Sequence, residues 1–342
     1  MDIRSLVKKE VRSLRAYQAK EIPCRIKLDA NESPYGFIEP LAAVKKIRTN
    51  RYPDPEAKAL KAVLAKDLGV KPQNLLQGNG SDELIYCLIA TFGGPVLYPV
   101  PTFSMYGIIS QALGEKKQEV PLDRDFDIDL DPMMTAIRKE KPKMTFLSSP
   151  NNPTGNCFSS EKILKIIAES KGIVVVDEAY QPFSSDRGFV PLLRDYKNLV
   201  IMRTLSKIGL AALRFGFIIA DEAIIDEVNK VRLPFNVNAL SQAVAVEALK
   251  KKKALKTAIH EIAAERDRMI SAMDNLKGVT PFPSEANFIL FRVKEPQKIY
   301  GRLLENGILV RDISDTVAGC LRVTVGTPKE NVLFLRALEK VI

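Results

Sequence analysis

The sequence predicts an α/β protein, with a large domain built on a mainly parallel sheet covered by helices and a smaller α+β domain after it. Short apolar runs alternate with helical patterns as far as about residue 231, and several runs are apolar throughout, as is typical of strands buried on both faces. A helical stretch without proline or glycine, from Ser241 to about Leu276, then leads to a second group of elements. We expect residues 29–240 to form the large domain, and residues 1–28 and 241–342 to form the small domain with an N-terminal arm.

The expected elements of the large domain follow one another at short intervals. Helical patterns occupy residues 60–68, 81–92, 132–139, 159–169 and 222–231. The expected strands are residues 95–98, 117–120, 144–148, 173–176, 199–202 and 215–220. Proline and glycine mark the turns between them, as in Arg51-Tyr-Pro-Asp-Pro55.

The small domain is expected to hold strands at residues 286–293, 309–311 and 320–325, with a helix at 296–305 that ends before Gly307. The last helix has several start signals. Thr327 is the expected N-cap, Pro328 the first helical residue, and Glu330 completes a capping box.

Composition limits the classes of function. The chain has 342 residues, 46% of them hydrophobic and 27% charged, which suits a globular protein with a full core. No run approaches the roughly 20 apolar residues of a membrane span, and the first residues lack a secretory apolar region, so we expect a cytoplasmic protein. The cysteines are scattered, and the single histidine, His260, lies in a charged helical pattern, so we expect no metal site, no disulfide framework and no role for His260.

The formal net charge of +10 comes with a basic run at residues 250–253. No zinc-finger spacing or aromatic RNA-binding motif accompanies this run, which has the helical pattern of a solvated face. We therefore expect small anionic molecules, and not nucleic acid, as partners.

A glycine-containing segment, Gln77-Gly-Asn-Gly-Ser-Asp-Glu83, opens a helix of the large domain. Glycines before a helix leave backbone N–H groups free to hold a phosphate, and Ser81 and Asp82 can cap the same end. The segment is not a P-loop, because no Gly-Lys-Ser/Thr follows, and it is not a dinucleotide fingerprint, because Glu83 stands where the third glycine belongs. An ordinary capped helix is the alternative interpretation.

Lys207 follows the apolar run that ends at Met202, so it lies just past the carboxyl end of an expected strand, where such sheets place reactive groups. A lysine there can form a Schiff base with an aldehyde such as pyridoxal phosphate. Most lysines are solvated surface charges, so this interpretation depends on other residues.

Two further motifs also follow expected strand ends: Ser149-Pro-Asn-Asn-Pro-Thr-Gly155 and Val176-Asp-Glu-Ala-Tyr180. All three loops can therefore open on one edge of the sheet. With Asn-Pro-Thr-Gly, Asp-x-x-Tyr and Ser-Lys in this order, the chain resembles the fold-type I pyridoxal-phosphate aminotransferases from about Leu28 to its C-terminus.

The resemblance implies a role for each motif residue. Asp177 pairs with the protonated pyridine nitrogen of pyridoxal 5'-phosphate, and Asn152 and Tyr180 hydrogen-bond its phenolic oxygen. Lys207 carries the cofactor and moves the proton of the substrate's α-carbon, so the catalytic residues are Lys207, Asp177 and Tyr180. The residues implied to hold the cofactor phosphate are Gly80, Ser81, Asp82, Ser206 and Arg214.

Two positions depart from the pattern of the family. Arg214 lies seven residues after Lys207, where many relatives have eight. Phe103 stands where relatives often have tyrosine, which implies stacking on the cofactor ring without a hydroxyl contact. Tyr106 is the alternative stacking residue.

Further motifs are similar to those of the histidinol-phosphate aminotransferases within this family. They include Lys27-Leu-Asp-Ala-Asn-Glu-Ser-Pro-Tyr-Gly36, Pro101-Thr-Phe-Ser-Met-Tyr106 and Cys320-Leu-Arg-Val-Thr-Val-Gly-Thr327. Such enzymes exchange the amino group between L-histidinol phosphate with 2-oxoglutarate and imidazole acetol phosphate with L-glutamate, in histidine biosynthesis.

This likeness also implies which residues bind substrate and partner. Arg311 and Arg322 receive the anionic groups of the substrates, with Tyr17 and Asn31 nearby. The active unit is a homodimer with shared sites, in which Tyr52 reaches the cofactor phosphate of the neighbouring subunit.

Two alternatives stay open. An aminotransferase of broad or aromatic specificity, or a threonine-phosphate decarboxylase, keeps the same cofactor residues. The fold could also serve as the ligand-sensing module of a regulator, since fold does not determine function, but the sequence offers no segment for a DNA-binding appendage.

Overall fold

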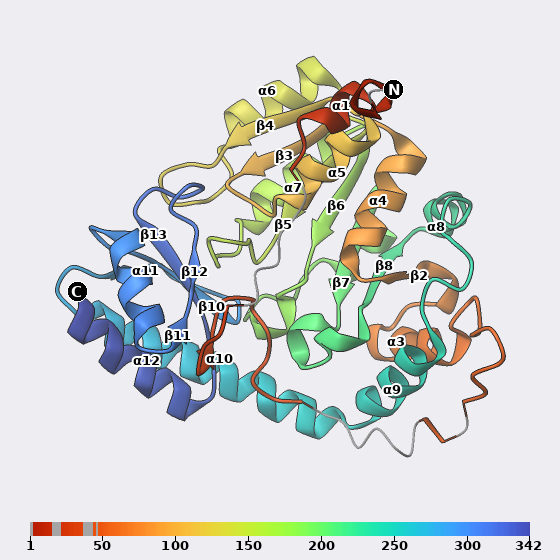
Figure 1. The fold of residues 1–342 in the computed structure, drawn as a ribbon. Helices are drawn as coiled ribbons and strands as arrows, with labels where there is room; N and C mark the ends of the chain where they lie inside the picture. The colour runs from red at the N-terminus through yellow and green to blue at the C-terminus, as the bar shows by residue number, and fades with distance from the viewer. Residues whose placement is uncertain (1–2, 16–21, 37–43, 46) are drawn as a thin grey trace.

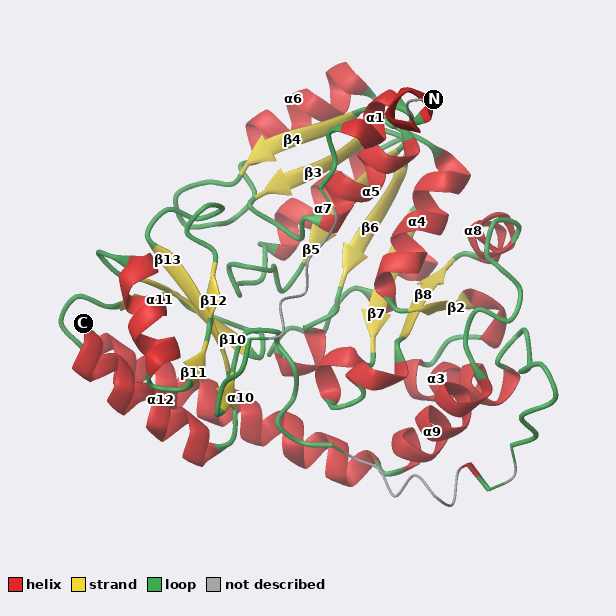
Figure 2. Cartoon of the chain, in the orientation of Figure 1, coloured by secondary structure: helices red, strands yellow, loops and turns green. Residues whose placement is uncertain are grey.

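The computed structural model describes residues 3–15, 22–36, 44–45 and 47–342. A large sheet with its helices forms one part of the molecule, and two small sheets form the other (Figure 1). Figure 2 shows the strands of the large sheet enclosed by helices, as expected for an α/β protein. None of the helices in these residues is long and apolar enough to cross a membrane.

The large sheet has the strand order β2-β8-β7-β6-β5-β3-β4. Neighbouring strands run parallel except where β8 meets β2 and β7, so the sheet is mainly parallel, as predicted. The strands are β2 (Leu75–Asn79), β3 (Val96–Val100), β4 (Lys117–Pro121), β5 (Met144–Ser148), β6 (Ile173–Asp177), β7 (Leu199–Thr204) and β8 (Phe215–Ala220).

Apolar side chains cover both faces of this sheet, because alternate residues of a strand point to opposite sides. On β7, Val200 and Met202 belong to the core beneath α4, α5 and α8, whereas Leu199 and Ile201 belong to the core beneath α6 and α7. The helices of this part are α3 (Lys58–Leu68), α4 (Ser81–Phe92), α5 (Met105–Leu113), α6 (Leu130–Glu140), α7 (Ser160–Glu169), α8 (Glu222–Asn229) and α9 (Ala239–Lys250).

The smaller part contains an antiparallel sheet of order β12-β13-β10-β9, and a parallel pair of β1 with β11. Its elements are β1 (Ile26–Lys27), α10 (Lys252–Asp274), β9 (Thr280–Pro281), β10 (Phe288–Arg292), α11 (Pro296–Glu305), β11 (Ile308–Leu309), β12 (Arg311–Asp312), β13 (Cys320–Thr324) and α12 (Pro328–Val341). The predicted capping box of α12 is confirmed, since Thr327 Oγ1 accepts from Glu330 N at 3.3 Å and Thr327 N donates to Glu330 Oε2 at 2.8 Å.

Two expected elements are divided. The helical stretch from Ser241 breaks at Lys251, which has a ψ of 44°, because α9 packs on α3 of the large part while α10 packs on α12 and β9 of the smaller part. The expected strand 309–311 divides at Val310, since β11 pairs with β1 and β12 pairs with β13. Neither β2 nor α5 was anticipated from the sequence.

The first described residues form η1 (Ile3–Leu6) and α1 (Lys9–Arg12). Gln111 of α5 donates to the carbonyl of Glu10 at 3.0 Å and to Ser13 Oγ at 2.9 Å, so this segment lies against the large part. The strand β1, by contrast, belongs to the smaller part. The predicted boundaries of the two domains stay a prediction.

A buried ion pair joins the ends of β6 and β7. Arg203 donates to Glu178 Oε2 from Nε at 2.8 Å and from Nη2 at 2.7 Å, and Phe189 N donates to Glu178 Oε1 at 2.5 Å. The side chain of Glu178 is 0% exposed and that of Arg203 17%. Burial raises the pKa of Glu178, and Arg203 opposes this effect.

Removing one partner of a buried pair leaves an uncompensated charge, which costs about 3–5 kcal/mol. We therefore expect Arg203→Met to lower the free energy of unfolding by about 3 kcal/mol, as measured by equilibrium urea denaturation. The matched control is Lys230→Met, which removes the exposed pair with Glu227 and should change the same quantity by less than about 1 kcal/mol. Equal losses in both variants would contradict this account of Glu178 and Arg203.

Candidate active site

The carboxyl ends of β5, β6 and β7 lie side by side at one edge of the large sheet. In the parallel register Ser148 lies opposite Asp177, and Asp177 lies opposite Met202. The loops that carry Asn152, Asp177 and Lys207 therefore begin at the same edge, which is where ligands of such sheets bind.

Asp177 is a buried carboxylate at the end of β6. Its Oδ2 accepts a hydrogen bond from the hydroxyl of Tyr106 at 2.6 Å, and its Oδ1 accepts from the backbone N–H of Ala179 at 3.1 Å. Burial raises the pKa of Asp177 to about 6, with both hydrogen bonds opposing the rise. Asp177 forms no ion pair with any residue that the structure describes.

Lys207 lies in the short helix η5 (Ser206–Ile208), directly after β7. Its side chain is half-buried, and Nζ lies 5.6 Å from the centre of the Tyr180 ring. Within the described chain this amino group makes no hydrogen bond and no ion pair. Lys207 therefore presents a free amine at the edge that Asp177 occupies.

Tyr180 is held by a residue from the N-terminal region. Asn31 Nδ2 donates to the Tyr180 hydroxyl oxygen at 2.9 Å, and Asn31 N donates to Thr324 Oγ1 at 2.9 Å. Asn31 adopts a left-handed conformation with φ 54°, which asparagine tolerates better than most residues. Because the Tyr180 oxygen accepts from Asn31, its own hydrogen is left to donate to a ligand.

Asn152 is linked to the smaller part through Arg322. Arg322 Nη1 donates to Asn152 Oδ1 at 2.6 Å, Nη2 donates to the carbonyl of Asp29 at 2.8 Å, and the guanidinium lies 5.2 Å from the centre of the Phe288 ring. Arg311, on the neighbouring strand β12, is opposite Arg322 in the register and is exposed. The structure thus places the two predicted substrate arginines next to each other.

The predicted phosphate-binding residues gather at the N-terminus of α4. Gly80 precedes this helix with φ 87°, and a Cβ at Gly80 would lie 2.8 Å from Arg214 Nη2. Arg214 pairs with Asp82 at 3.8 Å, and no side chain of the described residues caps the helix. Ser206 Oγ lies 2.9 Å from Thr204 Oγ1, which also contacts the carbonyl of Phe215 at 3.1 Å. The seven-residue spacing from Lys207 still brings Arg214 to Gly80.

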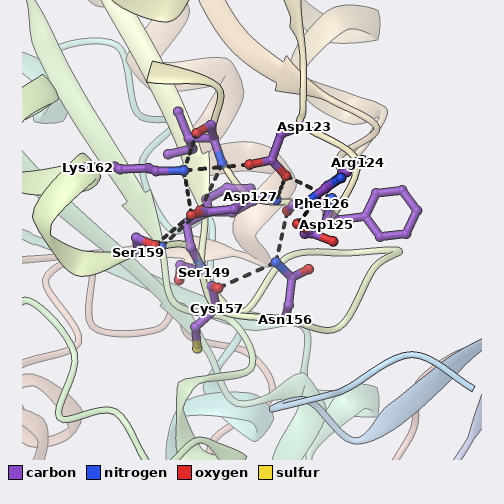
Figure 3. Close-up of polar contacts among 12 residues, drawn as sticks. Asp123, Arg124, Asp125, Phe126, Asp127, Ser149, Asn156, Cys157, Ser159 and Lys162 are labelled. Atoms are coloured by element: carbon purple, nitrogen blue, oxygen red, sulfur yellow. Dashed lines mark hydrogen bonds and ion pairs between the residues drawn. The ribbon is translucent and has the colours of Figure 1, made fainter. Parts of the chain in front are cut away.

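A polar network supports the loop that carries Asn152 (Figure 3). Asp127 accepts hydrogen bonds from the backbone N–H of Ser159 at 3.0 Å and its hydroxyl at 2.6 Å, and pairs with Lys162 at 2.7 Å. Burial tends to raise the pKa of Asp127, but the hydrogen bonds from Lys162 and Ser159 outweigh burial and lower this pKa. Asn156 Nδ2 donates to the carbonyl of Phe126 at 2.9 Å, so the segments 123–127 and 149–157 hold each other in place.

The two candidate stacking residues have different surroundings. Tyr106 is fully buried, and its ring stacks on Phe146 with centroids 4.6 Å apart, so it has no face left for a cofactor. Phe103 is only partly buried and meets the Tyr106 ring edge to face at 5.7 Å. Of the two, Phe103 alone can present a ring face to a ligand.

Of the other residues singled out in the sequence, Tyr52 and His260 lie apart from this group. Tyr52 is 81% exposed and stacks on Phe235 with centroids 4.6 Å apart. Tyr17 lies outside the described residues. His260 is exposed on α10.

Sequence analysis missed three polar contacts of the site. These are the hydroxyl of Tyr106 on Asp177, Thr324 under Asn31, and Asn287, whose Nδ2 donates to the Asn31 carbonyl at 3.0 Å. Tyr106 offered a signal, because it follows Phe103 by about one helical turn. Thr324 and Asn287 offered none, since they are far from Asn31 in the sequence.

With this geometry in place, comparisons with known proteins identify the family. The model of the "Aminotransferase class I and II" family matches residues 24–338. The chain belongs to the class I and II aminotransferase family. The expectations of an aminotransferase, of its fold-type I architecture and of pyridoxal phosphate as cofactor are thereby confirmed.

Individual members of the family are similar over nearly the whole chain. A histidinol-phosphate aminotransferase of Aquifex aeolicus is 45% identical, and the match covers 98% of each chain. The crystal structure of the histidinol-phosphate aminotransferase from Sinorhizobium meliloti, in complex with pyridoxal-5'-phosphate, has a TM-score of 0.86 at 26% identity and covers 98% of this chain and 97% of that one.

A structural neighbour with another activity is nearly as similar in fold. The L-threonine-O-3-phosphate decarboxylase of Porphyromonas gingivalis has a TM-score of 0.79 at 25% identity, over 92% of this chain and 98% of that one. Within the aminotransferase family, the choice of reaction therefore depends on the substrate pocket and not on the fold.

Proposed function

We propose that this aminotransferase exchanges the amino group between L-histidinol phosphate with 2-oxoglutarate and imidazole acetol phosphate with L-glutamate, as a cytoplasmic enzyme of histidine biosynthesis. The observation that carries the proposal is the pair of arginines beside Asn152. Arg322 is fixed by Asn152 and by the Asp29 carbonyl, and Arg311 lies opposite it. Two guanidinium groups suit a substrate phosphate and the carboxylates of the cosubstrate. The name of the Aquifex aeolicus relative supports the same substrate.

The residues at the strand ends fit pyridoxal phosphate. The buried Asp177 has no ion-pair partner among the described residues, and a protonated pyridine nitrogen would supply one. At the N-terminus of α4, Gly80 has no side chain to cover the first N–H groups of the helix, and Arg214 Nη2 lies 2.8 Å from where a Cβ of Gly80 would stand, so a phosphate can approach both. Ser206 and Arg214 add a hydroxyl and a guanidinium to the same site.

When bound, pyridoxal phosphate supplies an electron-withdrawing ring that stabilises negative charge on the substrate's α-carbon. Lys207 Nζ removes the proton of that carbon. The Tyr180 hydroxyl and Asn152 Nδ2 would donate to the phenolic oxygen of the cofactor, because the oxygens of both side chains already accept from Asn31 and Arg322. Phe103 would cover the ring. Asn31 would act here by orienting Tyr180.

A homodimer with shared sites also forms part of the proposal. The exposed ring of Tyr52 stacks on Phe235, and two further exposed apolar side chains lie close to Phe235 in the sequence. Leu233 is 69% exposed and Leu240 52%. Such a group of apolar side chains is typical of a protein interface. In a two-fold dimer whose axis passes through this group, the group on one subunit faces the same group on the other. Tyr52 of one subunit then lies against the neighbouring subunit.

The first prediction concerns the attachment of the cofactor. Because Lys207 offers a free amine beside Asp177, borohydride reduction followed by peptide mapping should find the cofactor on Lys207, and Lys207→Ala should abolish transamination. Lys61→Ala is the matched control, since Lys61 is a buried lysine of the same part of the molecule, and it should keep most of the activity. A reduced cofactor on any other lysine would contradict the assignment.

The second prediction concerns substrate choice. The value of kcat/KM should be at least about 100-fold higher for histidinol phosphate than for histidinol, because the missing dianion leaves the arginine pair uncompensated. Arg322→Gln should remove most of this preference, whereas Arg292→Gln, in the same sheet but stacked on Phe282, should preserve it. Equal values for both donors point to a broad-specificity aminotransferase, and release of carbon dioxide from threonine phosphate points to a decarboxylase.

The third prediction tests shared sites by complementation. Inactive Lys207→Ala and Tyr52→Phe proteins are mixed, and activity is measured after subunit exchange. If Tyr52 serves the neighbouring subunit, each heterodimer has one site with both lesions and one wild-type site, so activity rises above that of either parent. If every site uses its own Tyr52, each site carries one lesion and no recovery follows, which removes Tyr52 from the shared site.

A further inference from the structure

Tyr106 occupies a fixed position between the large sheet and α5. It is 0% exposed, stacks on Phe146 at a centroid distance of 4.6 Å and an interplanar angle of 10°, and meets Tyr98 at 6.1 Å. These contacts leave the ring no room to turn. Its hydroxyl points to Asp177, with 2.6 Å between the two oxygens.

Both oxygens of Asp177 are thereby engaged by donors from the chain, Tyr106 on Oδ2 and the backbone of Ala179 on Oδ1. Two donors on different oxygens fix the plane of a carboxylate. Each oxygen accepts more than one hydrogen bond, so this arrangement leaves acceptor sites for a ligand.

The surroundings make the Tyr106 hydroxyl a permanent donor. Burial raises the pKa of Tyr106 well above its ordinary value, so the phenol keeps its hydrogen throughout the range in which the enzyme works. Three groups favour the anion of Asp177: the Tyr106 hydroxyl, the Ala179 N–H and the charge of Lys207. The negative charge of Asp82 disfavours it. Ser148 and Tyr180 act on the Tyr106 hydroxyl.

We propose that Tyr106 is a positioning residue for the cofactor: its hydroxyl holds the Asp177 carboxylate ionised and oriented toward the pyridine nitrogen. The inference rests on the proposed function of Asp177. It assigns the two aromatic residues of one helical turn to different tasks, since Phe103 covers the ring while Tyr106 acts only through Asp177. A buried tyrosine with a purely structural role would stabilise the fold without affecting how the cofactor binds.

The test is the variant Tyr106→Phe, which keeps the stacked ring and removes one oxygen. The full chain, freed of cofactor, is titrated from pH 5 to 9 with pyridoxamine phosphate, which forms no Schiff base with Lys207. A hydrogen bond to a charged group is worth about 1.5–3 kcal/mol, so the dissociation constant at pH 7 should rise by about tenfold or more. Because the pKa of Asp177 rises when this donor is lost, the acid limb of binding, and that of kcat/KM in the loaded enzyme, should move to higher pH.

The matched control is Tyr98→Phe. Tyr98 is nearly buried in the same aromatic cluster, but its hydroxyl donates to Glu119 at 2.8 Å and not to Asp177. The Tyr98→Phe variant should leave both the dissociation constant of pyridoxamine phosphate and the pH profile unchanged. Thermal unfolding of both variants separates loss of stability from loss of binding. If Tyr106→Phe does not fold, Ser148→Ala, which alters the surroundings of the Tyr106 hydroxyl and leaves the ring intact, should shift the acid limb in the same direction by a smaller amount.

A double-mutant cycle with Asp177→Asn completes the test. If Tyr106 acts through Asp177, Tyr106→Phe has little further effect on binding in the Asp177→Asn protein. The inference is wrong if the effects of Tyr106→Phe and Asp177→Asn on binding are additive, or if Tyr106→Phe and Tyr98→Phe weaken binding equally. Neither result contradicts the role of Asp177. If Asp177→Asn itself leaves pyridoxamine phosphate binding unchanged, the proposed cofactor site fails, and the inference fails with it.

Discussion

The register of three parallel strands is the constraint on which the rest of the site depends. Because β5, β6 and β7 end together, three loops that are separate in the sequence open at one edge, with Ser148, Asp177 and Met202 opposite one another. The core on both faces holds this register, since a slip by one residue would turn Val200 and Met202 toward the wrong helices. The positions of the carboxylate and of Lys207 are therefore consequences of packing throughout the large sheet.

The position of Asp177 at the end of β6 is energetically unfavourable for its charged form, because the side chain is buried. A carboxylate withdrawn from water favours its neutral form, and the pKa near 6 reflects this tendency. The chain offsets part of the cost with the hydroxyl of Tyr106 and the N–H of Ala179, and no cation of the chain pairs with Asp177 among the described residues. Glu178, one residue later, solves the same problem differently, because Arg203 neutralises it within the protein. Asp177 is therefore the carboxylate that the proposed function pairs with a ligand, whereas Glu178 already has its cation within the protein.

The smaller part contributes to the same edge through polar contacts across the interface. Arg322 reaches Asn152, and Thr324, on the same strand, holds Asn31 against Tyr180. These contacts occupy the oxygens of Asn152 and Tyr180 and so determine which hydrogens face the site. A change in the position of the smaller sheet would thus alter the hydrogen bonds of Asn152 and Tyr180 without any movement of the large sheet.

The sequence by itself determined the α/β class, most of the elements and the residues at the strand ends. These features depend on local signals: apolar periodicity predicted β5 and β8 with their observed limits, and motifs directly after strands located Asn152, Asp177, Tyr180 and Lys207. Only the tertiary structure decided that the helical stretch breaks at Lys251, that Tyr106 serves Asp177 and that Asn31 meets Thr324 and Tyr180. The physical reason is that these outcomes depend on packing directions and on contacts between residues far apart in the chain, and hydrophobic periodicity along a single segment contains no information about either.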